Sequence, residues 1–310
     1  MGINKAKRAI IKALSFDEID IETSRNLADL KRLDPMKGFY KTVDTRVRNG
    51  EHLIPVRLFY PETADKNPNP EGNKLLVFFH GGGWATDHID NYERICDKMA
   101  TFTNYVVAAV EYRLAPEHKF PCGLEDCYTV AKSIYEGNFL LKVKWEDVAF
   151  IGDSAGGNLA AAMSLMARDR GEFLPVKQIL LYPAVYNDYS EESPFPSVVE
   201  NGSDYILTMG KMNDYLNLYE SSPADRMNPY FAPYIAENHE NQPDTLILTA
   251  EYCPLRDEGE AYGNKLLEAG NKVQVHRIKD ALHGYFALGI NGNFTLESLD
   301  YINKFLEEGL

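Results

Sequence analysis

The five residues Gly-Asp-Ser-Ala-Gly at positions 152–156 carry the side chain best placed to act as a nucleophile. They follow an apolar run over residues 148–151 and precede a helical pattern that begins at Asn158. In this strand–turn–helix setting, a G-x-S-x-G sequence makes a sharp turn that lifts the serine hydroxyl above the end of a sheet. The helix N-terminus then directs backbone N–H groups at developing negative charge. Ser154 is therefore the predicted nucleophile of an acyl-transfer reaction.

A glycine-rich loop, His-Gly-Gly-Gly-Trp at residues 80–84, follows a second apolar run over residues 75–79. Successive glycines let backbone N–H groups approach a ligand closely. An H-G-G-G loop early in such a sheet supplies donors to an oxyanion. A phosphate-binding P-loop is not indicated, because no Lys-Ser or Lys-Thr follows the glycines.

Of the seven histidines, His283 has the position expected of a general base. It comes just after the last predicted strand, and a histidine later in the chain than the nucleophile is the order expected when a G-x-S-x-G turn carries that nucleophile. His80 belongs to the glycine loop. The other histidines are in polar or strand contexts and are interpreted as surface or packing residues: His52, His88, His118, His239 and His276.

Together these motifs resemble those of the hormone-sensitive-lipase-like (HGGG) family of α/β-hydrolase carboxylesterases. The resemblance spans roughly residues 40–290 and extends to further short motifs: Tyr-Arg-Leu-Ala-Pro-Glu-His at 112–118, Phe-Pro at 120–121, Leu-Glu-Asp at 124–126, Asn-Pro-Tyr at 228–230, Ala-Pro at 232–233 and Pro-Leu-Arg-Asp-Glu-Gly at 254–259. It implies an α/β-hydrolase fold with a mostly parallel sheet, helices on both faces and a helical cap. It also implies hydrolysis of small or medium acyl esters through an acyl-enzyme intermediate.

By this resemblance, Ser154 corresponds to the nucleophile and His283 to the base. The oxyanion-hole donors correspond to the N–H group of Ala155 and two N–H groups from the glycine loop, with no choice possible between Gly81, Gly82 and Gly83. No metal or organic cofactor is required. Five cap and loop residues are candidates for an apolar substrate pocket or, equally, for ordinary packing: Trp84, Tyr205, Met209, Met212 and Tyr215.

One position departs from the family pattern, because Cys253 stands where the aspartate of an Asp-Pro-Leu-x-Asp-Glu-Gly motif is expected. That acid fixes the tautomer of the catalytic histidine and stabilises the imidazolium. A thiol with an ordinary pKa of about 8.5 is mostly neutral near pH 7 and does both poorly. In other triads, loss of the acid costs on the order of 10⁴-fold in kcat and leaves measurable catalysis.

Four interpretations of Cys253 stay open at this point. Ser154 and His283 act unaided in a slow esterase, or a nearby carboxylate substitutes, with Asp257 one helical turn further on. Glu251 and Asp280 are further candidates. Alternatively, the scaffold is a non-catalytic small-molecule binder, or Cys253 is an engineered or variant residue.

The elements that position these residues are predicted from apolar runs and helical periodicity. Apolar, β-branched runs predict six strands, at residues 75–79, 106–110, 148–151, 179–182, 245–250 and 273–278. Helical patterns fall between them at residues 92–101, 123–135, 158–168 and 258–269. This alternation predicts a doubly wound, largely parallel sheet within one domain of residues 1–310.

A helical cap is predicted from two segments that do not fit the strand–helix alternation. The chain from Ile179 to Thr245 is too long for a simple crossover and contains a helical pattern at residues 208–220. The first forty residues are also helical in pattern. We expect a cap formed by about residues 1–40 and an insertion at about residues 185–225, over the carboxyl ends of the strands.

Composition narrows the classes of function. Of 310 residues, 46 are acidic and 32 basic, and the net charge of −14 argues against nucleic acid as a partner. The sequence has no apolar run long enough for a membrane helix and no signal-peptide pattern, which predicts a cytoplasmic protein. The four cysteines form no C-x-x-C pair, and Cys96, Cys122 and Cys127 are predicted to be buried or partly buried free thiols. Because similar esterases dimerise through the corresponding edge strand, we also expect a homodimer that pairs the strands at residues 273–278.

Overall fold

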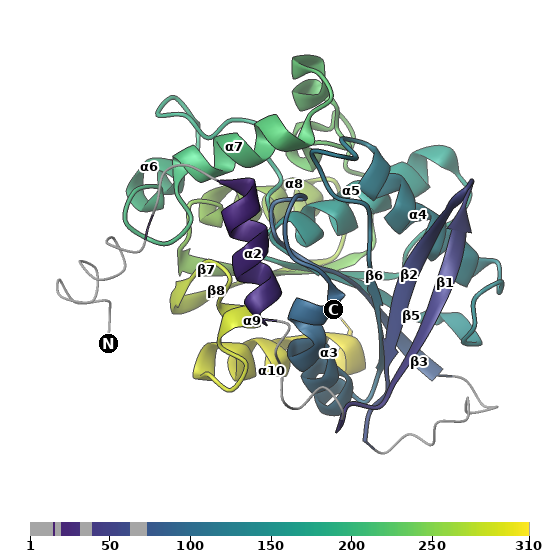
Figure 1. Cartoon of the computed structure of the whole chain (residues 1–310). Coiled ribbons are helices and arrows are strands. Elements are labelled where there is room, and N and C mark those ends of the chain that lie inside the picture. Colours follow the sequence, from purple (N-terminus) through teal and green to yellow (C-terminus); the bar gives the residue numbers. More distant parts are fainter. Residues whose placement is uncertain (1–14, 16–19, 32–38, 63–72, 310) are drawn as a thin grey trace.

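A twisted sheet of eight strands forms the centre of the part of the chain that the structure describes (Figure 1). The structure is a computed structural model that describes residue 15 and residues 20–31, 39–62 and 73–309. The strand order is β1-β2-β4-β3-β5-β6-β7-β8. The strands are β1 Thr42–Asn49, β2 His52–Phe59, β3 Asn73–Phe79, β4 Val106–Val110, β5 Val143–Asp153, β6 Lys177–Leu181, β7 Asp244–Tyr252 and β8 Val273–Leu282.

The six strands from β3 to β8 are parallel and correspond to the six predicted strands. Their apolar runs are buried from end to end in the middle of the sheet, as at Leu76, Phe150 and Leu180. Parallel strands are covered by helices on both faces, so continuous apolar runs are the pattern that they require. The α/β-hydrolase fold implied by the sequence is confirmed.

The antiparallel hairpin of β1 and β2 was not predicted from the sequence. The two strands pair over their whole length around a two-residue turn, Gly50-Glu51, and β2 adds the hairpin to β4. Exposed and buried positions alternate along β2, and β1 carries charged residues such as Arg46 and Arg48. Strand prediction from apolar runs misses such a pair, because only one face of an edge hairpin is buried.

Helices cover both faces of the sheet (Figure 1). The four predicted crossover helices are present as α3 Ile89–Thr103, α4 Cys122–Tyr135, α5 Ala155–Arg170 and α8 Arg256–Glu268. Helix α10, Asn293–Glu308, was not predicted, and it packs against α3 on one face. Helices α4 and α5 contact each other on the other face. The remaining short helices are α9 Tyr285–Leu288, η2 Pro223–Met227 and η3 Pro233–Ile235.

Three helices lie over the carboxyl ends of the strands: α2 Ile21–Lys31, α6 Pro196–Asn201 and α7 Met209–Tyr219 (Figure 1). Helix α7 confirms the helix predicted at 208–220. The Oγ atom of Ser15 accepts a hydrogen bond from the amide of Ile206 at 2.9 Å, which joins the two expected cap segments. Of the expected N-terminal segment, residues 1–14, 16–19 and 32–38 lie outside the described residues.

All four cysteines are free thiols, with Cys122 partly exposed and the others buried, which confirms the prediction made for Cys96, Cys122 and Cys127. Within the described ranges, no helix has both the length and the apolar character that crossing a membrane requires.

Candidate active site

Ser154 lies on a tight turn between β5 and α5. Its backbone has a positive φ of 55° and a ψ of −116°, a conformation that non-glycine residues seldom adopt. The turn packs directly on the end of β3, because a Cβ atom added at Gly156 would lie 1.9 Å from the carbonyl oxygen of Phe79. Only glycine allows this approach. The predicted sharp turn is therefore present, with Ser154 at its apex.

His283 follows β8 and reaches Ser154 across 129 residues of sequence. Its Nε2 atom lies 3.0 Å from Ser154 Oγ, within hydrogen-bond distance. The imidazole ring packs edge-on against Tyr182. Removal of the ring from water lowers the pKa of His283 to about 3. Near neutral pH the imidazole is therefore uncharged, and a neutral nitrogen facing the hydroxyl can act as a base.

Cys253 occupies the position beside the other nitrogen of His283. Its Sγ atom lies 3.1 Å from Nδ1, and the amide of Leu255 donates to the same sulfur at 3.4 Å. The cysteine side chain is fully buried. Burial raises the pKa of the Cys253 thiol well above its ordinary range, so the sulfur carries no charge near neutral pH. The structure thus brings Ser154, His283 and Cys253 together, with a neutral group in the third position.

A thiol differs from a carboxylate in the hydrogen bonds that it offers to His283. A carboxylate only accepts, which forces Nδ1 to carry the proton and leaves Nε2 free as a base. A thiol both accepts and donates. If the S–H group of Cys253 donates to Nδ1, the proton of the imidazole stays on Nε2 and the base is blocked. Cys253 therefore supplies neither the charge nor the strict tautomer control of an acid.

None of the candidate substitute acids contacts His283, whose hydrogen-bond partners in the described part of the chain are Ser154 and Cys253. Both carboxylate oxygens of Asp257 face away, with Oδ2 accepting from the amide of Ser197 at 2.7 Å and Oδ1 from Arg256 Nε at 2.7 Å. Glu251 Oε2 accepts from the amide of Asp280 at 2.6 Å. Asp257 is close to Cys253 in the sequence, but its carboxylate binds Ser197 and Arg256 and so stabilises the loop that carries Cys253.

The predicted oxyanion donors separate into two groups. The amide of Gly81 donates to Asp153 Oδ1 at 2.8 Å, so it is already used. The amides of Gly82, Gly83 and Ala155 have no hydrogen-bond acceptor in the described ranges, and all three residues line the cavity above Ser154. The sequence left open which glycine amides donate to the oxyanion, and Gly82 and Gly83 are the two that remain available.

Asp153 fixes the glycine loop to the nucleophile turn. Besides the Gly81 amide, its carboxyl group accepts from the hydroxyl of Tyr92 at 3.2 Å and from that of Tyr182 at 3.4 Å. Burial raises the pKa of Asp153 to about 7. This role of Asp153 could not be predicted from the sequence, because its contact with Gly81 depends on the adjacency of β3 and β5.

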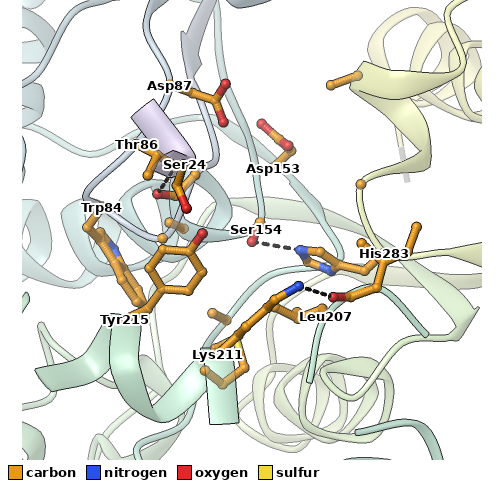
Figure 2. Close-up of a pocket in the computed structure, with 18 of the residues that line it drawn as sticks. Ser24, Trp84, Thr86, Asp87, Asp153, Ser154, Leu207, Lys211, Tyr215 and His283 are labelled. Carbon is orange, nitrogen blue, oxygen red and sulfur yellow. Dashed lines mark hydrogen bonds between the residues drawn. The ribbon is translucent and has the colours of Figure 1, made fainter. Parts of the chain in front are cut away.

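A cavity of about 1020 Å³ opens above Ser154 (Figure 2). Trp84, Met212 and Tyr215 line it, as the sequence suggested, whereas Tyr205 and Met209 are not among its lining residues. Lining residues that the sequence analysis did not select come mainly from α2, the loop before α3 and the turn before α7: Ser24, Thr86, Asp87, Ile206, Leu207 and Lys211. In the part of the chain that the structure describes, no group of three or more His, Cys, Asp or Glu residues is arranged to hold a metal ion.

The cavity wall is shaped by contact between the cap and the glycine loop. Gly83 has a positive φ of 58°, and a Cβ atom added there would lie 2.1 Å from the ring of Tyr215 in α7. The Tyr215 ring thus lies directly on one of the two candidate oxyanion-donor glycines. Figure 2 shows Trp84 and Tyr215 together on the side of Ser154 opposite His283.

Glu258, on α8, anchors the loop of Cys253 to the start of the cap insertion. Its Oε1 atom accepts from the amide of Val185 at 2.7 Å, the hydroxyl of Tyr189 at 2.9 Å and the amide of Tyr186 at 3.2 Å. Burial raises the pKa of Glu258 to about 8. The sequence motif contained this residue, but nothing in the sequence identified its partners.

Comparison with known proteins places this site among related sequences and structures. A family model described as alpha/beta hydrolase fold matches residues 76–287. An arylesterase of Saccharolobus solfataricus is 34% identical over 271 residues, which are 87% of this chain and 84% of that protein. Esterase LipI of Mycobacterium tuberculosis is 33% identical over 283 residues, 91% of this chain and 86% of that protein. The structure of a hyperthermophilic esterase from Pyrobaculum calidifontis has a TM-score of 0.86 and 32% identity and covers 99% of both chains.

Proposed function

Because the chain belongs to the alpha/beta hydrolase fold family, and within it to the hormone-sensitive-lipase-like carboxylic ester hydrolases, we propose that it cleaves esters through an acyl-enzyme formed on Ser154. The observation that carries this proposal is the 3.0 Å contact between Ser154 Oγ and the uncharged His283 Nε2. This pair opens into a cavity lined by Gly82, Gly83 and Ala155, whose amides have no hydrogen-bond acceptor in the described ranges. A nucleophile, a base and a set of oxyanion donors are the minimum that acyl transfer requires.

Acylation follows from the positions of these groups. Ser154 Oγ attacks the ester carbonyl while His283 Nε2 takes its proton. The carbonyl oxygen gains negative charge and accepts hydrogen bonds from Ala155 and the glycine loop, which stabilise the tetrahedral intermediate. His283 then returns the proton to the leaving alcohol, so the alcohol part of the ester lies on the His283 side of Ser154. Deacylation repeats these steps with water as the nucleophile.

Cys253 makes this a weakened form of the usual mechanism. The positive charge that develops on His283 during attack is not balanced by a carboxylate, and the buried thiol stays neutral. Loss of the acid costs on the order of 10⁴-fold in kcat in other serine hydrolases. We therefore expect slow ester hydrolysis above the uncatalysed rate.

A non-catalytic binder on the same scaffold is the alternative, and the neutral group at position 253 is the observation in its favour. A fluorophosphonate probe distinguishes the two, because it forms a covalent bond with an activated serine and not with an inert one. We expect the intact protein to gain the mass of one phosphonate group at Ser154. Ser154→Ala should gain none, and Ser164→Ala, which changes a buried serine elsewhere on α5, should label like the parent. A parent protein that is folded and unlabelled would support the binder.

The size of the cavity indicates the length of acyl chain that the substrate can have. A bounded space of about 1020 Å³ above Ser154, partly open to solvent, suits short and medium chains. We expect soluble butyrate esters to be hydrolysed faster than emulsified long-chain triglycerides. Faster release of fatty acid from the emulsion, measured by titration at constant pH, would contradict this assignment.

A further inference from the structure

The turn before α7 contains a strained residue beside the catalytic pair. Ile206 has a positive φ of 52°. This left-handed region is rare for side chains with two substituents on Cβ, and such residues persist only when their surroundings hold them. The turn closes tightly, since the amide of Leu207 donates to the carbonyl of Tyr205 at 2.5 Å. Something other than local preference must therefore keep Ile206 in this conformation.

Two side chains bind the two backbone groups of Ile206. Its amide donates to Ser15 Oγ at 2.9 Å, and its carbonyl accepts from the ammonium group of Lys211 at 2.8 Å. Lys211 lies in the first turn of α7, where its own amide donates to Thr208 Oγ1 at 3.2 Å. A charged donor makes a stronger hydrogen bond than a neutral one. The contact from Lys211 thus fastens the strained turn to the start of a capped helix.

The fastened turn forms one wall of the substrate cavity. Ile206, Leu207 and Lys211 all line it together with Ser154 and His283. Figure 2 shows Leu207 on the same side of Ser154 as His283, and it shows the side chain of Lys211 reaching from beside Tyr215 so that its ammonium nitrogen lies below His283. Since His283 protonates the leaving alcohol, this is the side on which the alcohol part of the ester lies. The acyl part extends toward the opposite side, where Trp84 and Tyr215 lie.

We propose that Lys211 is a positioning residue that holds Ile206 and Leu207 as a wall against the alcohol part of the ester. The substrate class that follows is esters of small, unbranched alcohols, because a bulky alcohol would need the strained turn to move away from His283. This inference rests on the proposed ester hydrolysis and adds the alcohol preference to it.

The test compares alcohol size with acyl size in the full-length protein. Initial rates are measured by titration at constant pH for ethyl and cyclohexyl butyrate, and for ethyl acetate and ethyl hexanoate. Lys211→Met should raise the cyclohexyl-to-ethyl ratio of kcat/KM about tenfold, since the wall is released. Lys211→Arg, which retains a cationic donor, should keep the ratio of the parent. The acetate-to-hexanoate ratio should stay the same in all three proteins, because the acyl side is not altered.

A second pair of variants tests the strain and does not depend on Lys211. Glycine adopts a positive φ without steric cost, whereas alanine does not. Ile206→Gly should therefore melt at a temperature equal to or above that of Ile206→Ala, the reverse of the usual order of these residues. Both should also accept cyclohexyl butyrate better than the parent does, because the side chain is removed.

Several outcomes would overturn the inference. One is an unchanged alcohol ratio in a folded Lys211→Met protein, and another is an equal shift in the alcohol and acyl ratios. A third is loss in Lys211→Met of activity only toward the half-ester ethyl hydrogen succinate, which would make Lys211 a site for a substrate carboxylate. An Ile206→Gly protein less stable than Ile206→Ala would refute the strained turn. If the parent hydrolyses none of these esters, it is the proposed function that fails.

Discussion

The turn after β5, which carries Ser154, and the turn after β7, which carries Cys253, are fixed in different ways. The first is fixed by close packing of backbone on backbone, as at Gly156 against Phe79. The second is fixed by side chains from elsewhere: Asn201 donates to the carbonyl of Cys253 at 3.1 Å and Ser197 to that of Pro254 at 2.7 Å. A turn fixed by packing loses its shape when its residues change. A turn held at its carbonyl groups keeps its shape while its reactive side chain is exchanged.

This difference explains how a thiol stands in the place of an acid without disturbing the site. Cys253 still lies 3.1 Å from His283 Nδ1, and the hydrogen bonds of Asp257, Arg256 and Glu258 still support the turn. The side chain at position 253 is a neutral thiol, and it lies within hydrogen-bond distance of the catalytic histidine. Substitutions in one turn or the other should therefore have effects of different size and sign.

Removal of the nucleophile should have the largest effect. Ser154→Ala should reduce kcat for p-nitrophenyl butyrate by at least about 10³-fold, because no acyl-enzyme can form and only the residual catalysis of the oxyanion donors and of binding remains. The release of p-nitrophenol is followed by absorbance. Ser164→Ala is the matched control. Equal turnover by Ser154→Ala and the parent would show that the turn after β5 does not carry the nucleophile.

Restoring an acid should have the next largest effect, in the opposite direction. Cys253→Asp should raise kcat by about 10²- to 10⁴-fold, because a carboxylate beside Nδ1 fixes the tautomer and stabilises the imidazolium. Cys253→Asn, of similar size and without charge, should give no such gain. Asp257→Asn should lower stability and leave kcat within a few-fold of the parent, because Asp257 binds Ser197 and Arg256. A severe loss of kcat in a folded Asp257→Asn protein would instead make Asp257 the working acid.

The pH dependence of kcat/KM should move in a defined direction. In the parent, the pKa of His283 is lowered to about 3 by burial, so the base stays unprotonated and the profile should be flat from pH 5 to 8. In Cys253→Asp, the carboxylate favours the protonated imidazole and raises the pKa of His283. The acidic limb of the profile should therefore appear at higher pH in the variant. A limb near pH 6.5 in the parent would show that the pKa of His283 is not lowered.

The smallest effect concerns stability and the anchor of the second turn. The pKa of Glu258 is raised from 4.5 to about 8, so the folded protein keeps a proton that the unfolded chain releases above pH 4.5. This contribution to stability falls as pH rises between those values, by up to about 1.4 kcal/mol per pH unit. Glu258→Gln has no titrating group at this position and so lacks the pH-dependent loss of stability. The melting temperature of the variant, relative to that of the parent at the same pH, should therefore rise from pH 5 to 8. The raised pKa of Asp153 also makes stability fall with rising pH, up to about pH 7. Because Asp153 is present in both the parent and the variant, its contribution cancels when their melting temperatures are compared.

Much of the fold could be predicted because the relevant signals are local. Six strands and five helices follow from apolar runs and helical periodicity, since a parallel sheet buries whole runs and an amphipathic helix buries one stripe. The hairpin of β1 and β2 and the helix α10 have weaker signals. The hairpin mixes charged with apolar residues, and α10 lies beyond the last strand of the predicted alternation.

At the site, residue types were predictable but their partners were not. The motifs identified Ser154 and His283, which the structure brings within hydrogen-bond distance. The use of the Gly81 amide by Asp153 depends on how β3 lies beside β5, which no short motif encodes. The strain at Ile206 likewise arises from contacts with Ser15 and Lys211. Such features are properties of the assembled chain.

The order of the reacting groups along the chain has a consequence for biosynthesis. Ser154 is translated 129 residues before His283, and His283 is placed only when β8 pairs with β7. At ribosomal rates of about 5–20 residues per second, roughly 6 to 26 s separate the two residues. Throughout that interval the nascent chain carries the serine without its base. Hydrolysis of an ester by chains still attached to the ribosome should therefore begin only after β8 has emerged. The time at which activity first appears would then report when β8 pairs with β7 and the sheet is complete.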